Sequence, residues 1–375
     1  MRIIVIAHFQ NDGSPNAIYI HNQIKALALK GNRIRVIVPV PVFKKDYYGN
    51  RISAVVKKDF IDEIEYYFLR EVSLSNYGEK TANAFFAKLA INKNYKKLVE
   101  QFNPDVIHAH TFGIDSDMLL EIKNKINVPC IITTHGTDLE KSVQINKSRL
   151  VNIINNIDAI ITVSEKLERK IKNLNTKCYV KTIYNGCDIN NIENVNKKKH
   201  SIVYVGALIK QKKVDIVIKA IFELANEIPD ISLKIIGDGV ERQNLQNLCV
   251  EYGIEDKIVF LGQLSNNEVL KIMSESEYFV MTSTNEGFGI VYIEAMASGC
   301  ITIGTRGEGI DGFIINEKNG FLVAPDSKMV AKVILKSEQN IDLKELIIDN
   351  AKNDARCLTW DRNAEEYIKV YKELI

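Results

Sequence analysis

Residues 278–304 read YFVMTSTNEGFGIVYIEAMASGCITIG, and the order of elements in this stretch decides the fold. An apolar run at Tyr278–Thr282 predicts a buried strand, and the residues Ile290–Ala297 have the pattern of a helix. A second β-branched run, Ile301–Gly304, follows Gly299 and Cys300. Buried, nearly continuous apolar strands that are separated by helices imply a parallel sheet covered on both faces.

The same alternation continues on both sides of this stretch. The first half predicts strands at Ile3–Ala7, Arg35–Pro39, Val106–Ala109, Cys130–Thr133, Ala159–Val163 and Val180–Ile183, with helices such as Ile18–Lys30 and Ala82–Phe102. The second half predicts strands at Ile202–Val205, Ser232–Ile236 and Ile258–Leu261, helices at Val214–Ala225 and Val240–Tyr252, and a last helix at Asp361–Leu374.

A polar segment, Asn190–Lys199, separates the two halves and predicts a domain boundary. We therefore expect an α/β protein with two doubly wound domains, residues 1–188 and 189–360, with the C-terminal helix 361–375 joining the first domain. Doubly wound sheets bind ligands beyond the carboxyl ends of their strands, so two facing sheets would hold a ligand in the cleft between them.

Length and composition agree with a two-domain globular protein. The chain has 375 residues, which exceeds the length at which a single hydrophobic core usually stops growing. It contains 46% hydrophobic and 26% charged residues, which are ordinary values for a globular protein. A formal charge of +2 argues against nucleic acid as a partner. The six cysteines form no C-x-x-C pair, and no stretch has the length of a membrane span. We expect a cytoplasmic protein with reduced thiols.

The loop between the strand and the helix of the opening stretch carries the strongest chemical signal. Gly287 and Gly289 allow close approach to the backbone, and the first amides of the helix can face an anion. Glu286 lies in this loop and Glu294 lies in the helix. Because an ionised carboxylate accepts hydrogen bonds from sugar and ribose hydroxyls, the pattern suits a nucleotide-sugar.

Seven residues separate Glu286 from Glu294, and the string EGFGIVYIEAMASG resembles the retaining family 4 glycosyltransferases of the GT-B fold. This resemblance implies two Rossmann-like domains that face each other across a cleft. It implies that Glu286 contacts the transferred sugar and that Glu294 holds the ribose. The donor-binding residues that it implies are Gly206, Gly287, Phe288, Gly289, Ile290, Val291 and Glu294. Cys300 stands where the family usually has proline.

Two other segments resemble motifs of the same family. Residues 204–215 resemble its G-R-L-x-x-x-K-G-x-D loop, in which Lys212 aligns with the lysine and Ala207 replaces the arginine. A cation there offsets charge that develops on the leaving diphosphate, and Lys210 or Lys213 could stand in for the arginine. Residues 133–138 resemble its T-H-G loop, which implies that His135 reaches the transferred sugar.

The resemblance implies a retaining, metal-independent hexosyltransferase without a cofactor. Its donor would be a nucleotide diphosphate-sugar, and its acceptor a saccharide or lipid-linked saccharide in bacterial cell-surface polysaccharide biosynthesis. A nucleotide-sugar epimerase or phosphorylase of the same fold remains an alternative. So does a non-catalytic regulatory partner that binds a nucleotide-sugar, because Ala207 replaces the arginine. The amino-terminal loop around Gly13 departs from the family, and the acceptor-binding residues stay unknown.

Four features allow rival interpretations. Asp115 and Asp117 form a D-x-D, but they open a helix, where acids complement the dipole. His108, His110 and His135 could converge at strand ends as a zinc site, although core or donor-site positions are favoured. Gly237-Asp-Gly239 is expected to line the nucleotide side of the donor. The lysine-rich segment 80–99 suits core packing by Phe85, Phe86 and Leu89, with peripheral contact to the inner membrane face as the alternative.

Overall fold

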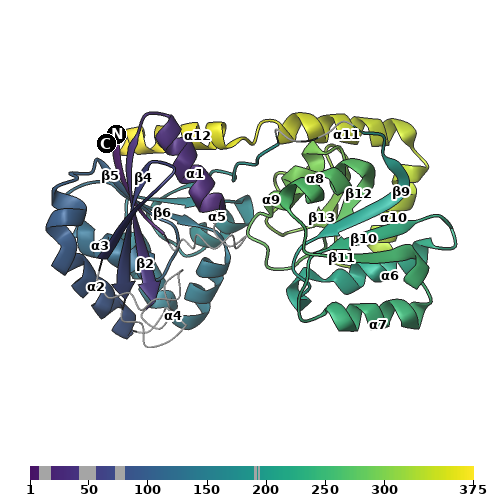
Figure 1. Ribbon diagram of the computed structural model, residues 1–375, viewed down its shortest axis with the longest axis horizontal. Helices are drawn as coiled ribbons and strands as arrows, with labels where there is room; N and C mark the ends of the chain where they lie inside the picture. Colours follow the sequence, from purple (N-terminus) through teal and green to yellow (C-terminus); the bar gives the residue numbers. More distant parts are fainter. Residues whose placement is uncertain (8–17, 42–55, 72–80, 190–191, 193–194) are drawn as a thin grey trace. The chain divides into compact units, whose positions relative to one another are not determined.

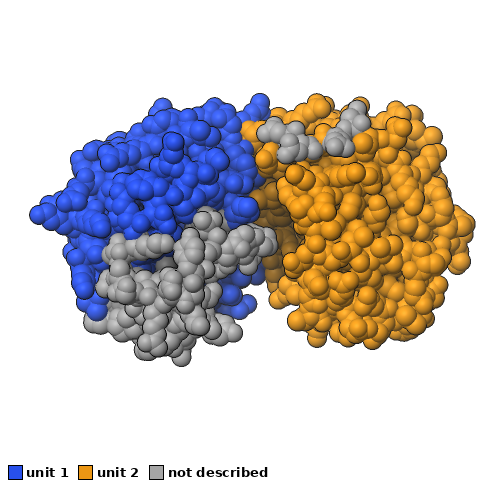
Figure 2. All heavy atoms as spheres, viewed as in Figure 1, with its two compact units in different colours: residues 1–163, 167–186, 360–375 blue, residues 164–166, 187–359 orange. Residues whose placement is uncertain are grey.

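The computed structural model describes residues 1–7, 18–41, 56–71, 81–189, 192 and 195–375. Contacts divide the chain into two compact units, coloured separately in Figure 2. Unit 1 contains Met1–Val163, Leu167–Gly186 and Trp360–Ile375, and unit 2 contains Ser164–Lys166 and Cys187–Thr359. Each unit has its own sheet with helices on both faces (Figure 1). The predicted α/β class with two doubly wound, mainly parallel sheets is confirmed.

The sheet of unit 1 has eight strands in the order β3-β4-β2-β1-β5-β6-β7-β8. All neighbours are parallel except β3 and β4, which form an antiparallel pair at one edge. The strands are β1 (Arg2–Ile6), β2 (Arg33–Pro41), β3 (Val56–Ile61), β4 (Ile64–Glu71), β5 (Val106–Ala109), β6 (Cys130–Thr134), β7 (Ala159–Thr162) and β8 (Tyr179–Thr182). The helices are α1 (Ile18–Leu29), α2 (Thr81–Tyr95), η1 (Lys96–Glu100), α3 (Ile114–Lys123), α4 (Thr137–Asn155), α5 (Glu165–Lys172) and α12 (Trp360–Leu374).

The last helix of the chain belongs to the core of unit 1. In α12, Ala364, Tyr367, Val370 and Tyr371 recur at helical spacing, and they are buried with the apolar face of α1 and with β1. Burial of each large side chain contributes about 1.5–3 kcal/mol. The same packing makes α12 a structural part of unit 1.

The sheet of unit 2 has six parallel strands in the order β11-β10-β9-β12-β13-β14. The strands are β9 (Lys198–Val205), β10 (Ser232–Ile236), β11 (Ile258–Gly262), β12 (Ser276–Val280), β13 (Ile301–Thr305) and β14 (Phe321–Val323). The helices are η2 (Lys210–Lys212), α6 (Val214–Leu224), α7 (Arg242–Tyr252), η3 (Glu255–Lys257), α8 (Asn266–Glu275), α9 (Ile290–Ala297), α10 (Ser327–Glu338) and α11 (Ile341–Ala355). Figure 1 shows α6 and α7 together on one side of this sheet, and α8 packs with α9.

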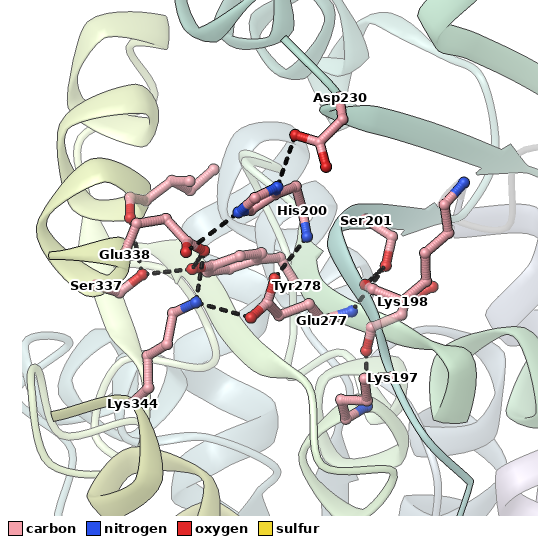
Figure 3. A network of polar contacts seen from close by, with 12 residues as sticks. Lys197, Lys198, His200, Ser201, Asp230, Glu277, Tyr278, Ser337, Glu338 and Lys344 are labelled. Carbon is pink, nitrogen blue, oxygen red and sulfur yellow. Dashed lines mark hydrogen bonds and ion pairs between the residues drawn. The ribbon is translucent and has the colours of Figure 1, made fainter. Parts of the chain in front are cut away.

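A polar network fastens α10 and α11 to the start of β12 (Figure 3). The Lys344 ammonium contacts Glu277 Oε1 at 2.7 Å and Glu338 Oε1 at 2.5 Å. The hydroxyl of Tyr278 donates to the same Glu338 oxygen at 2.6 Å, and His200 Nε2 lies 3.4 Å from the other oxygen. The network lies where β9 and β12 begin, at the end of the strands opposite to the loops described below.

Three expectations for individual segments differ from the structure. The helix expected at Ala82–Phe102 ends at Tyr95 and continues as the π-helix η1, and β9 begins at Lys198, inside the segment expected to be a linker. Leu89 was expected to pack in the core, but 48% of its surface is exposed. The side chains of Phe85 and Phe86, and the loop around Gly13, lie outside the described residues.

In the part of the chain that the structure describes, no helix combines the length and the apolar character needed to cross a membrane.

Candidate active site

The strand order of unit 2 has a topological switch point between β9 and β12. From β9 the chain continues through α6 to β10 on one side, whereas β12 continues through α9 to β13 on the other. The connections that follow these two strands therefore run to opposite sides of the sheet, and such a point is where open α/β sheets bind ligands. The loop after β9 contains Lys212, and the loop after β12 contains Glu286.

Hydrogen bonds hold these two loops together. The Thr284 amide donates to the carbonyl oxygen of Gln211 at 2.8 Å, and the Thr282 hydroxyl donates to the carbonyl oxygen of Lys213 at 3.2 Å. Lys213 itself has a left-handed backbone, with φ of 52°, which ends the turn of η2. As a result, the Lys212 ammonium forms an ion pair with Glu286 Oε2. The structure thus brings together two side chains that lie 74 positions apart.

The amino-terminal end of α9 offers backbone donors beside this pair. Gly289 begins the helix with φ of 83°, and no side chain caps it. A Cβ at Gly289 would lie 2.8 Å from the ring of Tyr292. Glycine is therefore required both for the positive φ and because a larger side chain would clash with this ring. The amides of Ile290 and Val291 have no hydrogen-bond partner among the described residues. Together with the helix dipole, these donors favour an anion.

Glu294 lies one turn further along α9 and is partly buried. Burial, with a smaller contribution from the negative charge of Asp188, raises the pKa of Glu294 to about 7. The carboxyl group therefore changes its charge near neutral pH. Once ionised, it can accept hydrogen bonds from a pair of ribose hydroxyls.

Glycines allow neighbouring loops to approach the β9 loop closely. A Cβ at Gly237, where φ is 130°, would lie 2.0 Å from the carbonyl oxygen of Gly206. A Cβ at Gly239 would lie 2.4 Å from the carbonyl oxygen of Leu208, which accepts from the Glu241 amide at 3.0 Å. The Gly237–Gly239 turn after β10 thus supports the β9 loop from the side away from β12.

Sequence reasoning missed Glu308, which lies in the loop after β13. Its Oε2 accepts a hydrogen bond from the Glu286 amide at 3.0 Å. The neighbouring Gly309 lies against the same loop, because a Cβ there would be 2.2 Å from the carbonyl oxygen of Gly287. A carboxylate that orients a backbone amide has no sequence pattern of its own, and the only available signal was the pair of glycines around Glu308.

His135 lies in unit 1, at the carboxyl end of β6, in a loop built around Asp138. One oxygen of Asp138 accepts from the amides of His135 at 3.0 Å and Gly136 at 2.9 Å, and from the Thr134 hydroxyl at 3.0 Å. The other oxygen accepts from the Phe112 amide at 3.0 Å. Asp138 therefore fixes the backbone that carries the His135 side chain.

The three histidines of unit 1 converge, as the strand positions suggested. His110 Nδ1 lies 3.3 Å from His135 Nε2, and the His108 and His110 rings are 4.3 Å apart between centroids. Both ring nitrogens of His108 already pair with hydroxyls, of Tyr371 and Thr133, at 2.8 Å each. The arrangement therefore does not suit a zinc site. Among the described residues, no group of His, Cys, Asp or Glu side chains could hold a metal ion.

The D-x-D of α3 lies in the first turn of that helix, as expected. Both oxygens of Asp117 accept from Arg149 Nη2, at 2.5 and 2.6 Å, and Asp115 accepts from the Thr111 hydroxyl at 2.7 Å. The carboxylate of Asp117 is thus engaged in an ion pair within unit 1.

Comparison with known proteins gives the same assignment for residues 17–354. Residues 17–191 match the family described as Glycosyltransferase Family 4, and residues 188–354 match the family described as Glycosyl transferases group 1. An uncharacterized glycosyltransferase of Methanocaldococcus jannaschii, MJ1178, is 31% identical over 284 residues, which cover 74% of this chain and 78% of the relative.

Solved structures share the fold over the full length. Sucrose-phosphate synthase from Thermosynechococcus elongatus has a TM-score of 0.77 at 19% identity, covering 100% of this chain and 99% of that one. HepE of Anabaena, in complex with UDP and glucose, has a TM-score of 0.76 at 18% identity and covers 100% of both chains. The chain thus belongs to the family 4 glycosyltransferases of the GT-B fold, and it is a glycosyl-transferring enzyme.

Proposed function

We propose that this enzyme transfers a hexosyl group from a nucleotide diphosphate-sugar to a hydroxyl group of a saccharide or lipid-linked saccharide. The transfer retains the configuration of the anomeric carbon and uses no metal or cofactor. The observation that carries the proposal is the Lys212–Glu286 pair beside the unpaired amides of Ile290 and Val291, at the switch point of the second sheet.

In this proposal the donor diphosphate rests on the amides of Ile290 and Val291, with Lys212 beside it. When the bond between the anomeric carbon and the phosphate oxygen breaks, negative charge grows on the diphosphate, and a fixed cation and helix amides stabilise it. The acceptor oxygen forms its bond to the anomeric carbon on the same face, and its proton passes to the leaving phosphate oxygen. Configuration is thereby retained.

The remaining side chains hold the two ends of the donor. Glu286 accepts a hydrogen bond from a hydroxyl of the transferred sugar, and Glu294 accepts from the ribose. His135 contributes a contact to the sugar from unit 1. Gly206, Gly287, Phe288 and Gly289 shape the backbone around the donor.

UDP-sugars are the first donors to test, because the HepE structure contains UDP and glucose. Synthesis of a cell-surface polysaccharide is proposed from the sequence resemblance. We place the reaction in the cytoplasm or at the inner face of the membrane, which agrees with six free cysteines. The engagement of Asp117 by Arg149 supports a reaction that does not use the D-x-D for a metal.

A thermal-shift screen of UDP, GDP and ADP and their hexose conjugates tests the donor site, because a ligand that binds only the folded state raises Tm. The active donor is then incubated with saccharide acceptors, and proton NMR of the product reports the anomeric configuration. Retention and loss of transfer in Glu286→Ala support the proposal. An inverted product, or unchanged transfer by that variant, contradicts it. Binding without turnover of any acceptor would favour the regulatory alternative.

A further inference from the structure

Two buried ring nitrogens in unit 1 have no hydrogen-bond partner among the residues that the structure describes. They are Nε2 of His110 and Nδ1 of His135, and neither contacts a polar group in the described part of the chain. The other nitrogen of each ring, Nδ1 of His110 and Nε2 of His135, faces its counterpart at 3.3 Å. The rings are close to parallel, with an interplanar angle of 9° and centroids 5.5 Å apart. The two histidines thus form one linear unit with a free nitrogen at each end.

Both rings are neutral at physiological pH. Burial lowers the pKa of His135 to about 3, and burial together with the neighbouring histidines holds the pKa of His110 well below its usual value. A neutral imidazole carries one proton, on either Nδ1 or Nε2. The contact between the two facing nitrogens must contain one proton. Two protons there would repel each other, and the absence of a proton would leave two lone pairs facing each other.

These conditions leave only two arrangements. If His110 Nδ1 carries the shared proton, His110 Nε2 is bare, and the proton of His135 must lie on Nδ1. If His135 Nε2 carries the shared proton, the proton of His110 must lie on Nε2, and His135 Nδ1 is bare. The two rings therefore have the same tautomer in either arrangement. We propose that His110 is a positioning residue that couples the tautomer of His135 to its own.

His110 is itself held in place from the core. The ring of His108 packs on the ring of His110, and His108 is fixed by hydroxyls at both nitrogens. One of these hydroxyls belongs to Tyr371 of α12, and the other, of Thr133, also meets the hydroxyl of Tyr367 at 3.1 Å. The orientation of the histidine pair is thus fixed by β5, β6 and the returning C-terminal helix.

The consequence for chemistry rests on the proposed function, in which His135 meets a hydroxyl of the transferred sugar. The free Nδ1 of His135 then offers that hydroxyl either a proton or a lone pair, and His110 Nε2 always has the opposite polarity. A fixed tautomer at such a contact decides which group donates and which accepts, as in hydrolase triads, where an orienting partner of the histidine has this effect.

The experiment measures the tautomers directly in the ligand-free protein. Long-range proton–nitrogen NMR spectra of the protein labelled with 15N-histidine distinguish a protonated from a bare ring nitrogen. Single histidine replacements assign the signals. We expect His110 and His135 to be neutral and to have the same tautomer. Opposite tautomers, or a charged ring at pH 7.5, would overturn the proposal.

Two variants separate positioning from mere packing. His110→Phe keeps the ring volume but has no nitrogen, so the His135 signals should average between tautomers. His110→Asn places an amide where Nδ1 was and should restore a single tautomer. His21→Phe, which removes a histidine elsewhere in unit 1, should leave His135 unchanged. A His135 that keeps its original tautomer in folded His110→Phe refutes the role of His110.

If His110→Phe does not fold, the wild-type spectrum and His110→Asn still decide the matter. The experiment uses no donor, so a negative result leaves the proposed transfer intact. Failure of the donor screen would likewise leave the tautomer result intact.

Discussion

Gly309 lies so close to Gly287 that a Cβ on it would be 2.2 Å from the Gly287 carbonyl oxygen. The loop after β13 therefore supports the loop that carries Glu286, and it does so through backbone contact that only glycine allows. The glycine contact therefore supports the loop that carries Glu286, together with the Glu308 carboxylate that accepts from the Glu286 amide.

The variant Gly309→Ala should lose both stability and activity. Its methyl group must displace the backbone next to Glu286, and such overpacking costs about 3 kcal/mol. Urea denaturation measures the free energy of unfolding, and initial rates measure transfer. Gly307→Ala is the control, because Gly307 has open space around it and φ of 78°, which costs about 1 kcal/mol in strain. Equal losses in the two variants would contradict the contact.

The variant Lys212→Ala should reduce kcat by about 100- to 1,000-fold, the usual cost of removing one group that stabilises developing charge. The melting temperature should also fall, because the variant leaves the Glu286 carboxylate, which is 18% exposed, without its cation. Lys210→Ala is the matched control, since Lys210 is an exposed lysine on the same turn. A comparable loss in Lys210→Ala would show that general charge, rather than the position of Lys212, matters.

Binding of UDP-glucose, if it is the donor, should strengthen as the pH rises through 7. Glu294 has a raised pKa of about 7, so about a tenth of it is ionised at pH 6 and about nine-tenths at pH 8. Affinity measured by calorimetry should therefore rise about tenfold between these values. Glu294→Gln should bind weakly without this pH dependence. A wild-type affinity that does not change with pH would contradict the ribose role.

The raised pKa of Glu294 has the opposite effect on the stability of the fold, which should decrease as the pH rises. A carboxyl group whose pKa is higher in the folded than in the unfolded state stabilises the fold at low pH, and this contribution is lost as the pH rises through the folded value. Glu294→Gln should therefore melt above wild type by a larger margin at pH 8 than at pH 5.5, because the loss is spread between the unfolded and the folded pKa values. Melting curves at the two pH values test this sign.

The variant Lys344→Ala should destabilise unit 2 by about 3 kcal/mol at pH 7, because it leaves two mostly buried carboxylates without their cation. Although burial opposes it, hydrogen bonds from Lys344 and Tyr278 hold the pKa of Glu338 below its usual value. The stabilisation is therefore lost as the pH falls through that value, and the two proteins should converge in acid.

Lys336→Ala is the control for this prediction. Its ion pair with Glu317 is exposed, at 47% and 46%, so its loss should cost less than about 1 kcal/mol. Equal destabilisation by the two variants would refute the importance of the network in Figure 3.

Strong periodic patterns predicted the fold well. Strand Ser232–Ile236 and helix Ile290–Ala297 were predicted with the bounds that the structure has. The β3–β4 hairpin was missed, because Asp62 and Glu63 form its turn with φ of 47° and 66°. Such backbone conformations are usually signalled by glycine or asparagine, and neither is present.

The meeting of the candidate site residues was easier to predict than the contacts that support them. Lys212 and Glu286 follow parallel strands, so the sheet brings them together at its carboxyl edge, and the sequence pattern predicted that meeting. Glu308 accepts a hydrogen bond from the backbone amide of Glu286. That contact depends on the path of the loop after β13, which the sequence does not reveal. Leu89 was misjudged because helix periodicity reports an apolar side chain but not what covers it.

The return of α12 to the first sheet has a consequence during synthesis. The ribosome releases all the strands of unit 1 early, yet Tyr367 and Tyr371 of its core are made only after unit 2. Unit 1 must therefore wait, incompletely packed, while unit 2 is synthesised, although domains usually fold in the order in which they emerge. A nascent chain stalled before Trp360 would expose an apolar sheet face to chaperones.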